Sequence, residues 1–364
     1  MKLLFHCAGA VRFTVETPER QPLGGSESCV AWLCRHLALL GHDVTLMCAM
    51  PSDTPARLAG VRHVPITQES AAFFAREDFE AIISVTAPQN AEPLRRVAPR
   101  ACQIAWLHLF GDQAAMAGLH AAAPHVDCAV AVSDCHRRSL DFRGPIQVIG
   151  NAIAPSFEAM FDMPSALLAA KRNRAVYASI PDRGLDWLIE AWRQAQVDTK
   201  LDIYSGMAIY QRSDAPLSPL YAQIEKTPRA RRHAPLGQRD LAMALRSAAF
   251  LTYPANEHET FCIVAQEAMA AGLKVVATEM GALPETTRGH ADLMRLDGLD
   301  VLQVPSLFAR RIEANVQEFL SRPEQWAEER FAQMQDVNRT ATWRVRAKEW
   351  EAFLSGVISW KRGS

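Results

Sequence analysis

The stretch Pro254-Ala-Asn-Glu-His-Glu-Thr-Phe-Cys-Ile-Val-Ala-Gln-Glu-Ala-Met-Ala-Ala-Gly272 decides the fold of this 364-residue chain. The apolar run 248–253 before it predicts a buried strand, and the apolar run 274–278 after it predicts another. Between them, the spacing of Ile263 and Glu267 predicts a helix, which Gly272 is placed to end. Strand, loop, helix and strand in this order predict a unit of a parallel α/β sheet.

Two glutamates lie eight residues apart in this stretch, Glu259 at the loop-to-helix junction and Glu267 inside the helix. Eight helical residues rise about 12 Å. Carboxylates so far apart cannot share one proton or hold one metal ion, but they can bind the two ends of a long ligand. The free N–H groups and the dipole of the helix N-terminus favour an anion between them. A nucleoside-diphosphate sugar has this layout, with hydroxyls at both ends and phosphates in the middle.

The composition is that of a globular protein that is long enough for two domains. A formal net charge of -1 argues against nucleic acid as a partner and against a strong general attraction to anionic membranes. Eight cysteines without a C-x-x-C pair predict buried thiols in a reducing compartment. No apolar run approaches the ~18 residues of a membrane span. We therefore expect a cytoplasmic protein, at most peripheral to the inner face of a membrane.

The first half of the chain alternates strands and helices, which predicts a parallel sheet with ligands at the carboxyl ends of its strands. Gly24 and Gly25 precede a helix, either as a flexible entry or as backbone that approaches a phosphate closely. His108 ends the strand 103–107, a place that suits a functional residue although a lone histidine is more often structural. Ser133 and Asp134 hold a similar place and are interpreted as the N-cap of the next helix.

A turn-rich segment from about 150 to 175 separates this half from a second alternating series. That series begins with the strand 175–179 and the loop that holds Ser179 and Arg183. A fixed guanidinium at the start of a helix can bind an anion, although a solvated loop arginine is an equal alternative. The basic segment 227–233 is interpreted as a solvated face, and contact with an anionic acceptor or with lipid headgroups is the alternative.

Three motifs together resemble the GT-B glycosyltransferases of the retaining, family 4-like type. Glu259 to Gly272 is similar to the E-x7-E signature of that family, with its aromatic after the first glutamate and its E-A-M-A-x-G tail. The segment Gly281-Ala-Leu-Pro-Glu285 resembles the loop after the next strand. Gly24-Gly-Ser-Glu27 and its helix resemble the N-terminal G-G-x-E region. The resemblance covers most of the chain.

The resemblance implies an α/β fold with two Rossmann-like domains that face each other across a cleft. Residues 1–165 would form an N-terminal acceptor-side domain and 166–341 a C-terminal nucleotide-sugar domain. The amphipathic terminal helix, about 342–364, would cross back to the first domain, and the domains would close over the donor by a hinge.

The resemblance also implies roles for individual residues. Glu259 would hold a sugar hydroxyl, Glu267 would bind the ribose, and Arg183 would neutralise the leaving diphosphate. Gly25 would approach that diphosphate from the other domain, and His108 would lie near the acceptor and the reacting carbon. The remaining donor-binding residues would be Gly24, Ser179, Thr260 and the N–H groups of Phe261, Cys262 and Ile263. No metal and no cofactor are expected, because arginine, N–H groups and helix dipoles would stabilise the departing charge.

The sequence departs from the family in places. Ala178 stands where relatives carry an arginine, Arg183 replaces their lysine, and Asn151 lies in a Gly-Asn-Ala rather than a Pro-Asn-Gly turn. The predicted function is metal-independent transfer of a hexosyl unit from a UDP- or GDP-linked sugar to a glycan, lipid-linked or other acceptor, with retention. The alternatives are a GT-B nucleotide-sugar 2-epimerase, whose members lack this E-x7-E pattern, and a sugar-nucleotide-binding subunit without turnover, which Ala178 would favour.

Overall fold

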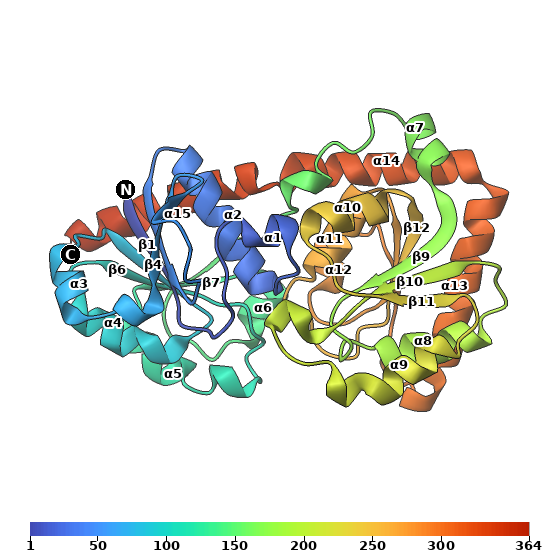
Figure 1. Ribbon diagram of the computed structural model, residues 1–364, viewed down its shortest axis with the longest axis horizontal. Helices are drawn as coiled ribbons and strands as arrows, with labels where there is room; N and C mark the ends of the chain where they lie inside the picture. Colours follow the sequence, from blue (N-terminus) through green and yellow to red (C-terminus); the bar gives the residue numbers. More distant parts are fainter. Residues whose placement is uncertain (364) are drawn as a thin grey trace. The chain divides into compact units, whose positions relative to one another are not determined.

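The structure is a computed structural model that describes residues 1–363. The chain divides into two compact units (Figure 1). The first contains Met1–Pro18, Leu23–Ala152 and the chain from Trp343 onward, and the second contains Glu19–Pro22 and Ile153–Thr342. The sequence placed the end of the first domain at 165, whereas the structure assigns 153–165 to the second unit. Local contacts explain this: Ile153 forms a parallel bridge with Thr342, and the Ser156 hydroxyl donates to the Gln238 carbonyl at 3.2 Å.

The first unit is built on an eight-stranded sheet of order β3-β4-β2-β1-β5-β6-β7-β8, parallel except for the β3–β4 pair. Its strands are β1 (Lys2–Cys7), β2 (Asp43–Cys48), β3 (Arg57–Leu58), β4 (Val61–Pro65), β5 (Ala81–Val85), β6 (Cys102–Trp106), β7 (Cys128–Ala131) and β8 (Ile146–Val148). The predicted parallel sheet is confirmed. The pair β3 and β4 was not predicted, because Arg57, Arg62 and His63 interrupt the apolar pattern there.

Helices α2 and α15 lie side by side against the first sheet. The helices of the first unit are α2 (Gly25–Leu39), α3 (Ala71–Arg76), α4 (Ala91–Val97), α5 (Leu119–Ala122), α6 (Asp134–Ser139) and α15 (Trp343–Gly363), while the short α1 (Thr17–Arg20) contains residues of both units. Trp350 of α15 is fully buried and packs edge-on against Trp106, with ring centroids 4.9 Å apart. Ser364, the last residue of the expected terminal helix, lies outside the described residues.

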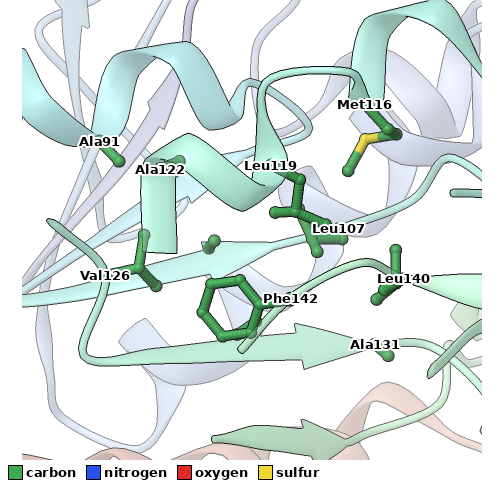
Figure 2. Close-up of a cluster of buried hydrophobic side chains, with 11 residues drawn as sticks. Ala91, Leu107, Met116, Leu119, Ala122, Val126, Ala131, Leu140 and Phe142 are labelled. Carbon is green, nitrogen blue, oxygen red and sulfur yellow. The ribbon is translucent and has the colours of Figure 1, made fainter. Parts of the chain in front are cut away.

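An apolar cluster anchors the chain that follows β6 (Figure 2). Leu107, which precedes His108, packs in this cluster with Met116, Leu119 and Phe142, all of which are buried. Burying these side chains is worth about 1.5–3 kcal/mol each. Because the chain is held both before and after His108, the position of this histidine at the end of β6 is well defined.

The second unit is built on a six-stranded sheet in which every pairing is parallel, of order β11-β10-β9-β12-β13-β14. Its strands are β9 (Arg172–Ala178), β10 (Lys200–Tyr204), β11 (Ala230–His233), β12 (Ala248–Tyr253), β13 (Lys274–Thr278) and β14 (Asp292–Met294). The strands on either side of the opening stretch are confirmed as predicted, and β9 and β12 form the centre of the sheet. Their carboxyl ends carry the two loops that the sequence singled out.

The helices of the second unit are α7 (Pro164–Ala170), which precedes β9, and α8 (Leu185–Gln194), α9 (Ser218–Glu225), α10 (Gln238–Arg246), α11 (Ile263–Ala270), α12 (Leu283–Thr287), α13 (Val304–Ser321) and α14 (Pro323–Thr340). Gly272, in the left-handed region at φ 73°, ends α11 as predicted. Among residues 1–363, no helix combines the length and the apolar character that crossing a membrane requires.

The basic segment 227–233 contains the edge strand β11 rather than a loop. Arg231 and Arg232 are exposed on this edge, where charged side chains discourage pairing with another chain. Arg232 also lies over the Tyr221 ring, 4.0 Å from its centroid. The segment is therefore a charged sheet edge, and its interpretation as a solvated face agrees with this exposure.

Candidate functional site

The loop between β12 and α11 is held by the last residue of β13 and by the segment that follows it. The Ala282 N–H donates to the Glu259 carbonyl at 2.8 Å, and the Thr278 hydroxyl donates to the Ala255 carbonyl at 2.5 Å. The Thr286 hydroxyl donates to the Phe261 carbonyl. These bonds satisfy carbonyls of an irregular segment and fix its path to the start of α11.

Gly281 is the residue that allows this close packing. Its φ is 59°, and a Cβ atom at this position would collide with the backbone of Glu259. A side chain at this position would therefore strain the backbone and clash with Glu259. This contact gives a physical reason for the Gly281-Ala-Leu-Pro-Glu285 motif: it supports the loop that carries Glu259.

Cys262 connects the loop to α11 in an unusual conformation. It has φ 70° and ψ 74°, the left-handed region that non-glycine residues rarely occupy, and its side chain is buried. Such a residue costs of the order of 1–3 kcal/mol and persists only where its surroundings enforce it. Phe261 is also buried, whereas Thr260 and Ile263 are half-buried. Strained residues of this kind cluster at functional sites, which makes the beginning of α11 a candidate ligand site.

Glu259 and Arg183 meet at the carboxyl edge of the second sheet. One Arg183 nitrogen lies 3.8 Å from Glu259 Oε1 and 3.2 Å from Glu257 Oε2. The Tyr253 hydroxyl donates to Glu259 Oε1 at 2.5 Å. Burial raises the pKa of the Glu259 carboxyl, and Arg183 and Tyr253 oppose that rise. Burial alone would lower the pKa of the Arg183 guanidinium, but Glu259, Tyr253 and Glu257 raise it.

Two buried tyrosines support the loop that carries Arg183. The Tyr177 hydroxyl donates to the carbonyls of Ile180 at 2.6 Å and Arg183 at 3.2 Å. The ring of Tyr177 stacks on that of Tyr253, with centroids 5.8 Å apart, and the Tyr253 hydroxyl lies 3.4 Å from Ser179 Oγ. One network thus joins Ser179, the Arg183 loop and Glu259.

Gly184 brings the two loops into contact. It has φ 78°, and a Cβ atom there would collide with the carbonyl of Pro254. The structure therefore brings together Ser179, Arg183, Glu259 and the segment 260–263 in the second unit, as neighbours at one sheet edge. Ala178, the last residue of β9, brings no guanidinium to this edge.

Glu267 has different partners from Glu259. It is 3% exposed, and its Oε1 accepts a hydrogen bond from Gln238 Nε2 at 2.6 Å. Burial raises the pKa of its carboxyl to about 8, and bonds from Gln238 and from the Ala154 backbone oppose that rise. Glu259 and Glu267 thus have different hydrogen-bond partners, which agrees with the prediction that they do not act as one carboxylate pair.

The candidate residues of the first unit lie at the carboxyl edge of its own sheet. Gly24 is the N-cap of α2 and its carbonyl accepts from the Ser28 N–H at 2.9 Å, while Gly25 is the first helical residue. His108 is 8% exposed, its ring packs at a tilt against Trp106 with ring centroids 4.6 Å apart, and its Nδ1 lies 3.5 Å from the Thr86 hydroxyl. Burial, with a smaller effect of His136, lowers the pKa of His108 to about 3, so its imidazole is neutral at physiological pH.

The neighbouring helix α6 begins as predicted. Ser133 is its N-cap, and its hydroxyl accepts from the His136 N–H at 2.9 Å. The His136 ring lies 2.8 Å from the Leu109 carbonyl, which fixes the chain after His108. Ser133 is thus accounted for as a capping residue.

Several residues of the site were missed from the sequence. Tyr177 and Tyr253 read as apolar strand residues, and only the position of Tyr253 at the end of β12 was a signal. Glu257 lies inside the opening stretch, but nothing in its spacing distinguished it. Gln238 gave no signal, because it meets Glu267 from 29 positions away in the sequence.

Known proteins resemble this chain both in the sequence around the Arg183–Glu259 site and in the overall fold. Residues 174–314, which contain the whole Arg183–Glu259 site, match the family Glycosyl transferases group 1. The structure resembles sucrose-phosphate synthase from Thermosynechococcus elongatus with a TM-score of 0.76 at 18% identity, over 99% of this chain and 100% of that one. The protein has the GT-B glycosyltransferase fold. The predicted fold class is confirmed.

Other relatives agree with this assignment. The GT-B fold is shared with HepE from Anabaena, solved in complex with UDP, with a TM-score of 0.73 at 15% identity over 98% of this chain and 100% of that one. An MMP alpha-(1->4)-mannosyltransferase from Mycolicibacterium hassiacum is 26% identical over 147 residues, or 39% of this chain. That match spans about a third (35%) of the mannosyltransferase's own length. Together the matches show the GT-B fold over the chain and a similarity to glycosyltransferases over residues 174–314.

Proposed function

We propose that this protein is a hexosyltransferase that uses a UDP- or GDP-linked sugar as donor and a glycan or lipid-linked acceptor. The observation that carries the proposal is the contact of Arg183 with Glu259 at the beginning of α11, where Cys262 is held in a left-handed conformation. A cation, a buried carboxylate and helix N–H groups at one sheet edge suit a ligand with hydroxyls and phosphates. HepE, of the same fold, is known in complexes with UDP and with UDP-glucose.

In this proposal each residue of the second unit binds one part of the donor. Glu259 accepts a hydrogen bond from a sugar hydroxyl, and Tyr253 keeps that carboxylate in position. Arg183, Ser179, Thr260 and the N–H groups of 261–263 receive the diphosphate, and Glu267 receives the ribose. The roles of Gly24, Gly25 and His108 on the acceptor side remain predictions. A neutral His108 would suit hydrogen bonding rather than charge stabilisation.

The proposed reaction is transfer with retention. The bond between the anomeric carbon and the diphosphate oxygen breaks, the acceptor oxygen bonds to that carbon on the same face, and the leaving phosphate takes the acceptor proton. Arg183 and the N–H groups at the beginning of α11 would stabilise the charge that develops on the diphosphate, so we propose that no metal takes part. A cytoplasmic location is part of the proposal, and no disulfide joins the eight cysteines, all of which lie within the described residues.

Replacing Arg183 tests the phosphate assignment. Arg183→Ala should lower acceptor-dependent turnover at least about a hundredfold, since one preorganised charge-stabilising group contributes that much or more. The turnover of Arg183→Lys should lie between those of the wild type and Arg183→Ala, because lysine keeps the positive charge but lacks the planar, two-donor geometry of arginine. Arg193→Ala, on the neighbouring helix α8, is the matched control and should retain normal turnover. Wild-type rates in Arg183→Ala, with normal thermal unfolding, would show that the phosphate assignment is wrong.

One assay separates transfer from the two alternatives. Release of UDP or GDP from a panel of nucleotide sugars is measured with and without acceptor. Release that depends on acceptor supports transfer. Binding of the donor without release would indicate a sugar-nucleotide-binding subunit, and exchange of the hydrogen at sugar carbon 2 would indicate an epimerase.

A further inference from the structure

Thr86, the residue after the last position of β5, has an unusual backbone conformation. Its φ is 57°, in the left-handed region. For a β-branched residue this is a genuine outlier, which persists only where the surrounding structure enforces it, whereas glycine or asparagine adopts such a φ at lower cost. The residue lies at the carboxyl edge of the first sheet, the edge at which α/β sheets bind ligands. A strained threonine in such a place requires an explanation from its side chain.

Two hydrogen bonds hold Thr86 in this conformation. Val85 and Trp106 are register partners in the parallel pair of β5 and β6, and the Thr86 N–H donates to the Trp106 carbonyl at 2.9 Å. The Ser84 hydroxyl donates to the Ala87 carbonyl at 3.3 Å. These bonds fix the chain before and after the Thr86 side chain. Its direction is therefore set by the pairing of the strands.

The side chain of Thr86 contacts the ring of His108. Its Oγ1 lies 3.5 Å from Nδ1 of His108, and within residues 1–363 its hydroxyl makes no other hydrogen bond. The contact is long for a hydrogen bond, so it contributes to orientation more than to stability. The His108 ring also packs at a tilt against Trp106 and is buried. The strained residue and the buried ring thus face each other at the ends of β5 and β6.

The chemistry of this pair decides which ring nitrogen of His108 carries the proton. Burial lowers the pKa of His108 to about 3, so the ring is neutral and has a single N–H. An imidazole lone pair is far more basic than a hydroxyl oxygen. The pair is therefore more stable when the Thr86 hydroxyl donates and Nδ1 accepts. The proton of His108 then lies on Nε2, because the bond made by one nitrogen fixes the state of the other.

We propose that Thr86 is a positioning residue, whose hydroxyl orients the His108 ring and keeps the proton of that ring on Nε2. In this state neither nitrogen can serve as a base, because Nδ1 accepts from Thr86 and Nε2 carries hydrogen. His108 acts toward a ligand as a hydrogen-bond donor, and the acceptor proton goes to the leaving phosphate. The action on a ligand rests on the proposed function. The position of the proton does not, so it can be measured without turnover.

Two other histidines of the first unit provide references of opposite kind. Nδ1 of His136 accepts from the Val132 N–H at 3.3 Å, and its Nε2 lies 2.8 Å from a backbone carbonyl, so its proton is on Nε2. Nε2 of His63 accepts from the Val15 N–H at 3.3 Å, and its Nδ1 lies 3.2 Å from a backbone carbonyl, so its proton is on Nδ1. Long-range proton–nitrogen NMR spectra of the full-length protein, labelled with ¹⁵N-histidine, distinguish the two patterns.

The spectra test the state of His108 directly. The signals of His108 are assigned by their loss in His108→Asn, and we expect the wild-type pattern to match that of His136. Thr86→Ser keeps the hydroxyl and should keep the pattern. Thr86→Val has the same shape and remains β-branched, but its Nδ1 neighbour loses the donor, so the Nδ1 signal of His108 should move. A wild-type pattern other than that of His136, or an unmoved Nδ1 signal in Thr86→Val, would overturn the proposal.

A matched substitution controls for the loss of a threonine hydroxyl elsewhere in this unit. Thr45 is fully buried on β2, and its hydroxyl has no hydrogen-bond partner within the described part of the chain. Thr45→Val should therefore leave the signals of His108 where they are in the wild type. Movement of these signals in Thr45→Val as large as in Thr86→Val would overturn the assignment to a direct contact.

Acceptor-dependent turnover tests what the orientation of His108 does. Thr86→Val should lower kcat about tenfold or more, because a misplaced group at a reacting centre costs at least that much, and should leave the KM for the donor unchanged. Thr86→Ser should restore kcat. Normal kcat in Thr86→Val, with the Nδ1 signal moved, would show that Thr86 has no positioning role. If the wild type shows the expected NMR pattern but no turnover, the state of His108 stands and the proposed function is wrong.

Discussion

Glu259 is the residue on which most of the candidate donor site depends. Its side chain is 13% exposed and is surrounded by a tyrosine hydroxyl, an arginine and the backbone that Gly281 supports. Burial favours the protonated acid, whereas Arg183 and the Tyr253 hydroxyl favour the carboxylate. The balance decides whether Glu259 accepts hydrogen bonds, as the proposed contact with a sugar hydroxyl requires.

Tyr253→Phe should shift that balance in a known direction. Loss of the phenol removes a hydrogen bond to the carboxylate, so the pKa of Glu259 rises above its already raised value. The acidic limb of the pH profile of kcat/KM should therefore move to higher pH, with the activity loss greatest at low pH. Tyr221→Phe, which changes a tyrosine outside the site, should leave the profile unchanged. If the acidic limb did not move in Tyr253→Phe, the ionisation of Glu259 would not be what controls kcat/KM at low pH.

Among the elements, the loop 254–262 shows how a motif distant in sequence supports a site. Its shape depends on bonds from the segment after β13 and on the missing side chain of Gly281. The strands β12 and β13 and the helix α11 were predictable, because their apolar runs and the glycine after α11 are local signals. The bonds between the loop and α12 were not, because they join residues about 25 positions apart.

A pair of glycine variants tests whether close packing at Gly281 supports the loop 254–262. Gly281→Ala should impair donor binding at least tenfold, because the new Cβ would collide with the Glu259 backbone and displace the loop. Gly289→Ala is matched in backbone conformation, at φ 82°, but its Cβ would meet no atom within 4 Å. Both variants carry the cost of left-handed alanine, about 1 kcal/mol, and only Gly281→Ala adds the collision. Donor titration followed by thermal shift gives the comparison, and equal donor affinity in the two variants would refute the supporting role.

For the whole molecule, the terminal helix α15 is part of the core of the first unit although it is last in sequence. Trp343, Ala347, Trp350 and Leu354 are buried, as the amphipathic pattern predicted. Ion pairs add to this attachment: Lys361 lies 2.8 Å from Asp127, and Arg362 lies 2.7 Å from Glu80. Folding of the first unit therefore needs the end of the chain.

Two tryptophans on this helix test its contribution. Trp350→Ala should lower the free energy of unfolding by about 3–5 kcal/mol, since it empties a fully buried space beside Trp106. Trp360→Ala should change it by less than about 0.5 kcal/mol, because Trp360 is 59% exposed. Chemical denaturation followed by tryptophan fluorescence and circular dichroism measures both. Similar effects from the two substitutions would contradict the assignment of α15 to this core.

Local pattern was enough to predict the alternating strands and helices, the parallel sheets, the E-x7-E stretch and the amphipathic end of the chain. These features follow from burial, whose periodicity in the sequence is that of the strand or helix that is buried. The strands β3, β4, β11 and β14 escaped prediction because charged or short segments at or next to a sheet edge lack that periodicity.

Partners that meet through strand order could not be predicted in the same way. Gln238 meets Glu267, Tyr253 joins Ser179 to Glu259, and loops that begin near Arg12, Met50 and Ile66 enclose one pocket. Each contact depends on which strands lie next to one another and on side-chain direction, neither of which is a periodic property of the sequence. The opening stretch thus indicated a ligand with two ends, and the folded chain decided which arginine, tyrosine and glutamine surround its two glutamates.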